Sequence, residues 1–431
     1  MKLPDNINKI CDIIYRNNFK VYIVGGVVRD MYLNKEPKDW DIITDSPAEF
    51  IEMLPYKVIK TGKDIFDTYK IVIGDTFCDI SVLKGDNIEQ DLLKRDFTIN
   101  AIAYDIDEDK YIDPAGGIED IQYNKLIKAV NNPEKRFEED PLRMLRAIRL
   151  SVELDFTIEE NTYETICEMA YLLEKSSNER IRDEFSKIMV SQYVEKGVFL
   201  LKNTGLLNYI IPELLEGDGM PQRGDHLYDV LEHNIKTAAY IRNNLNLRLA
   251  ALLHDVGKPR TLVEVEGVRS FPAHDKKSAE MAEEILKRLR YPKETIIEVS
   301  ALIGYHLFIY KPWAPKKQLI KLIAHLGDTG VMRLIELLYA DRRAINPNMR
   351  LDYVDMMKEK VEKLLHDKSV IGISDLKIEG NDIKEYLNIK SGPKVGEILE
   401  DIWDEVLEDP TLNKRDKLIM LIKKYNDIQE G

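Results

Sequence analysis

Cysteine is scarce in this sequence, with only Cys11, Cys78 and Cys167, far apart along the chain. A disulfide framework needs paired cysteines and a structural zinc site needs closely spaced ones, so both are excluded. No apolar run is long enough to cross a bilayer, which excludes a membrane protein of the helical kind. The opening residues MKLPDNINKI lack the apolar stretch of a signal peptide, so we expect a cytoplasmic protein.

An excess of positive charge is also missing, because 62 Lys and Arg stand against 76 Asp and Glu, for a formal net charge of −14. Affinity for nucleic acid comes from clustered Lys and Arg, so a broadly basic, nonspecific nucleic-acid binder is excluded. Any contact with RNA must come from a local patch. The 431 residues, 44% of them hydrophobic, suffice for two to four globular domains.

The most informative stretch is VYIVGGVVRDMYLNKEPKDWDIIT, residues 21–44. Tyr22 to Val24 predicts a short strand and Val27 to Leu33 a helix, with Gly25 and Gly26 at the turn between them. Glycines at such a turn let the backbone approach a ligand closely, and a helix N-terminus favours an anion. The pattern indicates a phosphate-binding turn, with a simple tight turn as the alternative.

Two aspartates, Asp39 and Asp41, follow and run into the apolar pair Ile42-Ile43. Side chains at positions i and i+2 of a strand lie on one face, so the two carboxylates point the same way. Such a pair is costly unless a cation bridges it, and Mg²⁺ prefers carboxylate oxygens together with substrate phosphates. We therefore expect a Mg²⁺ site here, with two solvated aspartates as the alternative.

GGVVRD followed by KDWDI resembles the opening motif of the class II tRNA nucleotidyltransferases and bacterial poly(A) polymerases, in the polymerase β-type superfamily. The resemblance implies that Gly25, Gly26 and Arg29 seat a triphosphate and that Asp39 and Asp41 hold two Mg²⁺ ions.

A third acidic residue belongs to the same expected site. Residues 66–73 and 77–83 are rich in β-branched and aromatic residues and flank Gly74-Asp75-Thr76, which predicts a hairpin. The resemblance implies that Asp79 on the second strand is a catalytic carboxylate that completes the metal site. An edge-strand aspartate that faces water is the alternative.

The segment KRDFTINAIAYD, residues 94–105, resembles the family motif RRDFTINA. By that resemblance Arg95, Asp96 and Asn100 recognise the ribose of the incoming nucleotide. Lys94 stands where the family has arginine, which keeps the charge but loses the planar fork needed for bidentate contacts.

From Asn131 onwards the pattern predicts helices without strands. FEEDPLRMLRAIRLSVEL, residues 137–154, predicts one amphipathic helix, and Asp140 and Arg143 at i and i+3 are expected on one side of it. Glu139-Asp140-x-x-Arg143 resembles the family's EDxxR motif, which implies that Asp140 and Arg143 read the base edge of CTP or ATP. We also expect Arg146 to bind the nucleotide. The alternative for the whole segment is a core helix whose basic side chains face solvent.

The helix SSNERIRDEFSKIM, residues 176–189, resembles the family's final conserved helix. Its Glu179 and Arg180 are expected to be structural supports.

Four of the seven histidines fall between residues 226 and 274, and His254-Asp255 opens the sequence HDVGK. This motif resembles the HDIG variant of the HD domain. His and Asp ligands suit a transition metal or Mg²⁺, which can activate water for phosphoester hydrolysis. We expect a divalent ion (Mg²⁺, Mn²⁺, Ni²⁺ or Fe²⁺) at His233, His254, Asp255, His274, His306 and Asp341. His325 and His366 are expected to be buried core histidines.

The resulting prediction is an α+β protein with a polymerase β-type nucleotidyltransferase head and a small mixed sheet, followed by helices. The expected domains are the head (1–130), a helical neck that binds RNA (131–222), an HD domain (223–345) and a helical tail (346–431). The implied reaction is template-independent addition of nucleotides from CTP and ATP to the 3′ end of tRNA. Rival functions are a poly(A) polymerase, an A-adding enzyme, an HD-type phosphohydrolase and a non-catalytic RNA-binding module, and the oligomeric state is open.

Only residues 84–90, KGDNIEQ, separate the predicted third strand from DLLKRD. Full CCA-adding relatives carry a longer flexible loop here, which is thought to help the pocket switch from CTP to ATP. A connection this short is little more than a turn and cannot swing as a lever. We therefore lean towards an enzyme that stops after CC, with full CCA addition or A addition as alternatives.

Overall fold

The computed structural model describes residues 3–37, 39–61, 68–73, 76–222, 224, 226–366 and 372–427. The chain forms two compact units, residues 1–212 and 213–431, and each is described by itself. Within the described ranges, no helix combines the length and the apolar character that a membrane crossing requires.

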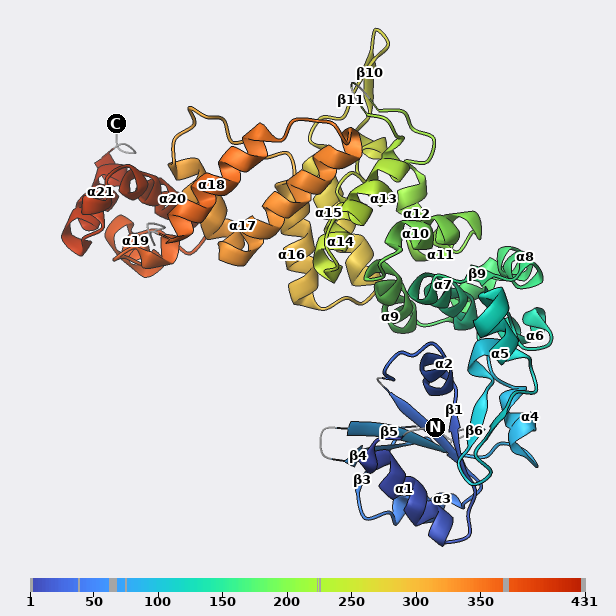
Figure 1. The fold of residues 1–431 in the computed structure, drawn as a ribbon. Coiled ribbons are helices and arrows are strands. Elements are labelled where there is room, and N and C mark those ends of the chain that lie inside the picture. Colours follow the sequence, from blue (N-terminus) through green and yellow to red (C-terminus); the bar gives the residue numbers. More distant parts are fainter. Residues whose placement is uncertain are drawn as a thin grey trace. The chain divides into compact units, whose positions relative to one another are not determined.

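A seven-stranded mixed sheet organises the first unit (Figure 1), which confirms the expected α+β class. Its order is β3-β4-β5-β2-β1-β6-β7, and β2 and β5 are parallel while the other neighbours are antiparallel. The strands are β1 (Val21–Val24), β2 (Trp40–Thr44), β3 (Lys57–Lys60), β4 (Thr68–Ile73), β5 (Thr76–Val82), β6 (Ala103–Asp105) and β7 (Lys110–Ile112). Helix α1 (Asp5–Arg16) buries Ile7, Ile10 and Ile14 at helical spacing, and α2 (Gly26–Tyr32) and α3 (Ala48–Glu52) follow β1 and β2.

The predicted hairpin is confirmed for the residues that the structure describes, because β4 and β5 pair antiparallel. Residues 66, 67, 74 and 75 of the expected hairpin lie outside the described residues. Strand β5 lies between β4 and β2, so the alternative of Asp79 on an edge strand is wrong.

The short connection after β5 leads directly into helix α4 (Ile88–Leu92). The Asn87 side chain caps this helix by accepting a hydrogen bond from the Gln90 amide at 3.0 Å. The Lys84 amide donates to the Asp91 carboxylate at 3.1 Å, and the Asp86 amide donates to the Gln90 side chain at 3.2 Å. The connection is therefore tied to the helix that follows it.

Helices complete the first unit, and the single helix expected over residues 137–154 is wrong. Helix α6 (Pro133–Glu139) ends before Asp140, which has extended backbone angles, and α7 (Leu142–Leu154) begins after Pro141. Proline disfavours helical geometry in the residue before it, so the chain breaks at Asp140. The remaining elements are α5 (Gly117–Glu119), η1 (Thr98–Asn100), η2 (Asp120–Asn124), α8 (Glu160–Met169), η3 (Ala170–Lys175), α9 (Asn178–Met189), α10 (Val194–Asn203) and α11 (Leu207–Ile210).

The expectation of no strands after Asn131 is also wrong. Strand β9 (Thr157–Ile158) pairs with β8 (Leu126–Ile127), and β10 (Val263–Val265) forms a hairpin with β11 (Val268–Ser270). Strands of two or three residues leave too weak a periodic pattern to be recognised in the sequence.

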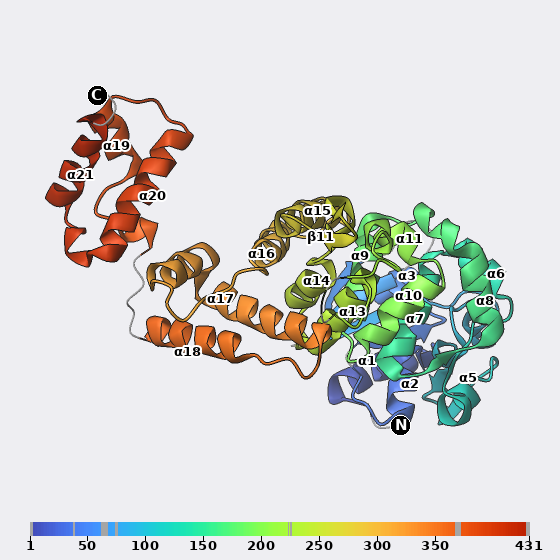
Figure 2. The same cartoon turned by 90° about the horizontal axis from the view of Figure 1, so that it is seen from above.

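The second unit is helical apart from that hairpin. Its helices are α13 (Val230–Tyr240), α14 (Leu245–Leu253), α15 (His274–Arg288), α16 (Lys293–Gly304), α17 (Lys317–Ile345), α18 (Asp352–His366), α19 (Gly380–Leu387), α20 (Pro393–Glu408) and α21 (Arg415–Asp427), with the short α12 (Pro212–Leu215) at the boundary. Helix α17 bends at Gly327, where φ is +71°, and it runs beside α18 (Figure 2). Helices α19 to α21 share a small core around Ile402, Trp403 and Leu418.

Two histidines of this unit differ from expectation. His325 and His366 were expected in the core, but both are exposed on helices. The Nδ1 atom of His325 lies 2.7 Å from the Lys321 carbonyl, one turn earlier on the same helix. An apolar pattern around a helical histidine does not reveal which face the ring occupies.

Candidate active sites

Two carboxylates meet at the centre of the sheet in the first unit. Strands β2 and β5 run parallel in a register that places Asp41 beside Asp79. Side chains at the same register of neighbouring strands share a face of the sheet. Asp41 and Asp79 are both partly buried, whereas Asp39, just before β2, is exposed. The structure thus brings together the three expected catalytic carboxylates.

The electrostatics of this group favour a cation. Burial raises the pKa of Asp41, and Asp79 and Asp39 raise it further while Arg95 opposes them. Burial also raises the pKa of Asp79, with Lys70 opposing and Asp39 adding to the shift. One Asp79 oxygen, Oδ1, is buried without a hydrogen-bond partner among the described residues. Carboxylate oxygens that lack donors fit a divalent ion of the Mg²⁺ type.

Gly25 brings an arginine against this carboxylate group. Its φ of +75° is a conformation that side-chain-bearing residues rarely adopt, and a Cβ there would lie 2.7 Å from Arg95 Nη1 and 3.6 Å from Asp41 Oδ2. At Gly26 a Cβ would lie 3.4 Å from Arg29 Nη2. The two glycines therefore leave room for the guanidinium groups of Arg95 and Arg29 at the turn before α2.

A chain of polar contacts connects α2 with α7. Arg29 Nη1 donates to Asn100 Oδ1 at 2.8 Å, and Asn100 Nδ2 donates to Asp96 Oδ1 at 3.1 Å. Arg146 Nη2 lies 2.5 Å from Asp96 Oδ2. Burial alone would raise the pKa of Asp96, but Arg146 and Asn100 outweigh it and lower that pKa. Four of the expected nucleotide-binding residues thus form one connected network.

Asp140 and Arg143 contact different partners on the protein. Asp140 precedes α7, and it accepts two hydrogen bonds from Arg180 of α9, at 2.8 and 3.2 Å. Arg143 instead donates to Glu139 Oε2 at 2.9 Å and to the Arg136 carbonyl at 3.1 Å. Pro141 separates Asp140 from α7, so the two residues do not stand one turn apart on a single helix as the sequence predicted. Arg180, expected as a structural support, holds the Asp140 carboxylate, a partner that the sequence did not identify.

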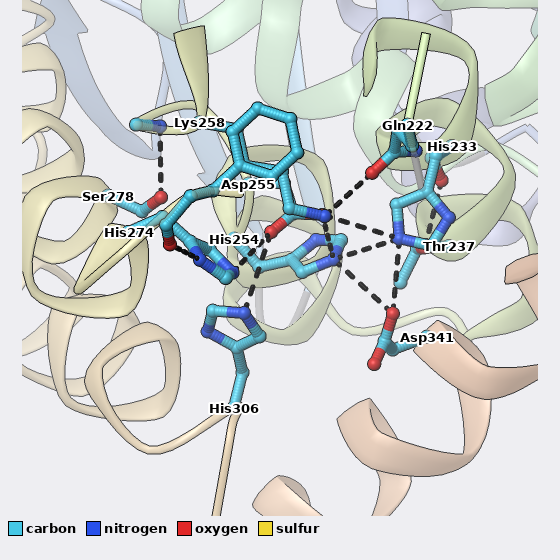
Figure 3. Close-up of polar contacts among 12 residues, drawn as sticks. Gln222, His233, Thr237, His254, Asp255, Lys258, His274, Ser278, His306 and Asp341 are labelled. Carbon is cyan, nitrogen blue, oxygen red and sulfur yellow. Dashed lines mark hydrogen bonds and ion pairs between the residues drawn. The ribbon is translucent and has the colours of Figure 1, made fainter. Parts of the chain in front are cut away.

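The second unit gathers its six expected metal ligands from five helices or their ends. His233 comes from α13, His254 ends α14 and is followed by Asp255, His274 opens α15, His306 follows α16, and Asp341 comes from α17. Figure 3 shows His274 and His306 on one side of the site and His233 and Asp341 on the other.

Asp255 links the two sides of this cluster through its two oxygens. Its Oδ1 lies 3.2 Å from His274 Nε2 and 3.5 Å from His306 Nε2, while its Oδ2 lies 3.3 Å from His254 Nε2. On the second side, Asp341 Oδ1 lies 3.1 Å from His233 Nε2. The arrangement therefore offers two neighbouring ligand groups that share one carboxylate.

The orientation of the rings supports metal binding. Nδ1 of His254, His274 and His306 lies 2.7 to 2.8 Å from a backbone carbonyl, so Nδ1 carries the proton and donates it. The Nε2 lone pairs of His274 and His306 then face the lone pairs of Asp255 Oδ1, and none of these atoms has a hydrogen-bond partner among the described residues. Acceptors that face acceptors at this spacing fit a divalent ion between them.

The charges of the buried side chains also favour a bound cation. Burial lowers the pKa of His254, but Asp255 and Asp341 outweigh it and raise that pKa to about 10. Burial raises the pKa of Asp255, yet His254 and Lys258 hold it well below its usual range. A field that favours positive charge between buried imidazoles also favours a bound cation.

A cavity of about 210 Å³ opens onto this cluster and contains residues that the sequence pattern did not assign. Buried Lys258 lies 2.5 Å from Asp255 Oδ2 and donates to Gln222 Oε1 at 2.6 Å. The His226 ring lies 5.1 Å from the His233 ring, and burial and Lys258 lower the His226 pKa to about 4. Lys258 stands inside HDVGK and could have been selected with the motif, whereas Gln222 and His226 carry no such signal.

Three family models match the chain. Residues 21–87 and 72–127 match the Poly A polymerase head domain, residues 155–217 match the probable RNA and SrmB-binding site of polymerase A, and residues 223–328 match the HD domain.

Curated relatives match either most of the chain or about half of it. The A-adding tRNA nucleotidyltransferase of Deinococcus radiodurans is 32% identical over 397 residues, which is 88% of this chain and 89% of the relative. The CC-adding tRNA nucleotidyltransferase of Halalkalibacterium halodurans is 40% identical over 194 residues, 45% of this chain and 51% of the relative. Among solved structures, the Bacillus stearothermophilus CCA-adding enzyme in complex with CTP matches with a TM-score of 0.73 at 26% identity, covering 100% of this chain and 99% of that chain.

Proposed function

Because this chain belongs to the tRNA nucleotidyltransferase family and is therefore an enzyme, we propose that it adds nucleotides from CTP and ATP to the 3′ end of tRNA. The pairing of Asp41 with Asp79 beside the Gly25 turn carries this proposal. We assign nucleotide addition to residues 1–130, RNA binding to 131–222, an HD domain to 223–345 and a helical tail to 346–431, in a cytoplasmic protein.

In this mechanism the tRNA 3′-hydroxyl attacks the α-phosphate of the nucleoside triphosphate, and pyrophosphate leaves. Asp39, Asp41 and Asp79 would hold Mg²⁺, which stabilises negative charge at reacting oxygens when it is bound. Arg29 binds the triphosphate, since its guanidinium fork matches phosphate oxygens. The resemblance implies a ribose contact for Arg95, but its position against the Gly25 turn also suits a phosphate contact, and we propose that role for it. The glycine turn admits the phosphates close to the backbone, which orients the α-phosphate towards the carboxylate group.

The base and ribose are read by residues in and just before η1 and α7. Asp96 and Asn100 contact the ribose, while Asp140, Arg143 and Arg146 offer an acceptor and several donors to the edge of the base. Arg180 holds the Asp140 carboxylate in a fixed orientation, so the acceptor is already placed before the nucleotide arrives. A protein surface of this kind selects CTP or ATP without a nucleic-acid template.

The number of nucleotides added is the finer question, because relatives of this chain carry the names A-adding, CC-adding and CCA-adding. We favour CC addition. Hydrogen bonds of Lys84, Asp86 and Asn87 hold the connection over residues 84–87 against α4. The connection is too short to move towards α7.

A tRNA that ends at the discriminator base, incubated with CTP and ATP, tests this proposal. A product that halts at CC supports it. Completion to CCA would replace it with full CCA addition. No extension of this substrate, together with addition of A to a tRNA that ends in CC, would replace it with A addition.

We propose a second activity for the second unit, metal-dependent hydrolysis of phosphoesters such as the 2′,3′-cyclic phosphates of damaged RNA ends. The two ligand groups that share Asp255 support it, because a divalent ion (Mg²⁺, Mn²⁺, Ni²⁺ or Fe²⁺) bound there would activate water. Assaying the His254→Ala and Asp41→Ala variants for both activities tests whether the two sites work independently. His254→Ala is expected to abolish hydrolysis and keep nucleotide addition, and Asp41→Ala the reverse, whereas hydrolysis retained in His254→Ala contradicts the proposal.

A further inference from the structure

The segment that joins α16 to α17 begins at the cavity of the second unit and exposes large apolar side chains along its length. Trp313 is 79% exposed, Ile309 is 52% exposed and Leu307 is 42% exposed. Leu307 follows the ligand His306 and lines the cavity itself. Scattered exposed apolar residues are normal on a protein surface, but three within residues 307–313 are an unusual concentration, which favours a binding role.

The patch is held in a fixed shape. Tyr310 is buried, and its hydroxyl donates to the Ala314 carbonyl at 2.8 Å. Lys360 of α18 lies over the Tyr310 ring at 4.7 Å and donates to the Pro312 carbonyl at 3.3 Å. These contacts anchor the backbone on both sides of Trp313. The indole is therefore displayed to solvent from an ordered turn, at a small entropic cost for binding.

The segment that carries Trp313 differs in charge from the chain as a whole. Residues 299–327 contain four lysines and no Asp or Glu, in a chain whose net charge is −14. Lys317 and Lys321 pair with Glu408 and Asp404, but Lys311 and Lys316 are exposed. The Lys311 ammonium lies 5.7 Å from the centre of the Trp313 ring. An exposed indole with flanking lysines suits a polyanion that carries flat rings.

We propose that residues 307–317, the Trp313 platform, bind the unpaired 3′ end of an RNA and direct its terminal phosphate into the cavity of the second unit. A base stacks on Trp313 while Lys311 and Lys316 contact backbone phosphates, which is how single strands are held without sequence preference. This deepens the proposed phosphoesterase activity, on which it rests, by making RNA ends rather than free nucleotides the preferred substrates.

The test compares an RNA hexanucleotide that ends in a 2′,3′-cyclic phosphate with 2′,3′-cyclic AMP, using the full chain. Trp313→Ala is expected to weaken binding of the fluorescently labelled hexanucleotide about tenfold and to raise its KM similarly. Hydrolysis of 2′,3′-cyclic AMP should be unchanged. Trp313→Phe, which keeps an aromatic face, should restore most of the affinity. Ile297→Ala serves as the matched control, since Ile297 on α16 is also exposed, at 58%, and lies outside the platform.

The outcomes separate the two proposals. Unchanged binding and KM for the hexanucleotide in Trp313→Ala would overturn the platform. An equal loss of hydrolysis with both substrates would also overturn it, because Trp313 would then act only through the shape of the cavity. If the wild-type chain hydrolyses neither ester, the phosphoesterase proposal fails, and the binding comparison alone decides whether Trp313 holds RNA.

Discussion

Asp41 and Asp79 lie side by side on parallel strands, although they are 38 positions apart in the sequence and β3 and β4 intervene in the chain. Each is partly buried, and each contributes to the negative field of the site. Two carboxylates in this position reduce the stability of the fold unless a cation binds, because burial and like charge both disfavour ionisation. The arrangement therefore suits the binding of a cation and does not by itself stabilise the fold.

Replacing Gly25 by alanine should impair nucleotide binding. The Cβ would lie 2.7 Å from Arg95 Nη1, so the arginine must move away from the carboxylates. We expect a rise in KM for CTP of about tenfold, together with a backbone cost of roughly 1 to 2 kcal/mol in the free energy of unfolding. Gly116→Ala is the control, since Gly116 also has a positive φ, +76°, but no atom within 4 Å of its Cβ. A KM that rises equally in both variants would contradict the role given to Arg95.

The contact of Asp96 with Arg146 should be measurable as a coupling energy. In a double-mutant cycle with Asp96→Asn and Arg146→Met, urea unfolding should show a coupling of about 1 to 2 kcal/mol, because Asp96 is buried and the two side chains are in contact. Additive effects of the two substitutions would show that the contact contributes nothing to stability.

The same aspartate predicts a pH dependence. The folded pKa of Asp96 lies below its unfolded value of about 3.9, so its contribution to stability is present above that pH and is lost as the pH falls through the folded pKa. Wild-type protein should therefore lose stability on acidification below about pH 4 more steeply than Asp96→Asn. Parallel stability curves for the two proteins would contradict the lowered pKa.

Divalent metal should stabilise the second unit. A metal that binds only the folded state at about 100 times its Kd adds about 2.7 kcal/mol to the free energy of unfolding. Calorimetry of chelator-treated protein should show this gain on adding Mn²⁺ or Ni²⁺, and Asp255→Asn should remove it. His325→Ala is the control, because His325 is an exposed histidine outside the cluster. A gain that survives in Asp255→Asn would place the metal elsewhere.

Much of the site could be expected from the sequence, because its residues stand in short motifs. Gly25-Gly26, Asp39-x-Asp41 and His254-Asp255 each lie within a few positions of one another, and local geometry limits where such side chains point. The pairing of β2 with β5 could not be derived in this way. Parallel strands are joined by long connections, and the sequence does not show which strands become neighbours in the sheet.

The errors have identifiable physical reasons. Pro141 was present in the sequence and should have broken the expected helix, because the residue before a proline avoids helical geometry. The ion pair of Asp140 with Arg180 joins residues 40 positions apart, and it depends on how α7 packs against α9. Long-range contacts of this kind leave no periodic signal in a single sequence.

The central claim is that nucleotide addition depends on Asp41 and Asp79, and one comparison tests it most directly. Asp41→Asn and Asp79→Asn are each given a tRNA that lacks its 3′ end, with radiolabelled CTP and Mg²⁺, beside wild type and the exposed control Asp12→Asn. Both site variants should melt at or above the wild-type temperature in the absence of metal, since one of two neighbouring, partly buried like charges has been removed. Both should incorporate CTP at least roughly 100-fold more slowly, whereas the control should match wild type. Incorporation at the wild-type rate by either folded site variant would contradict the account.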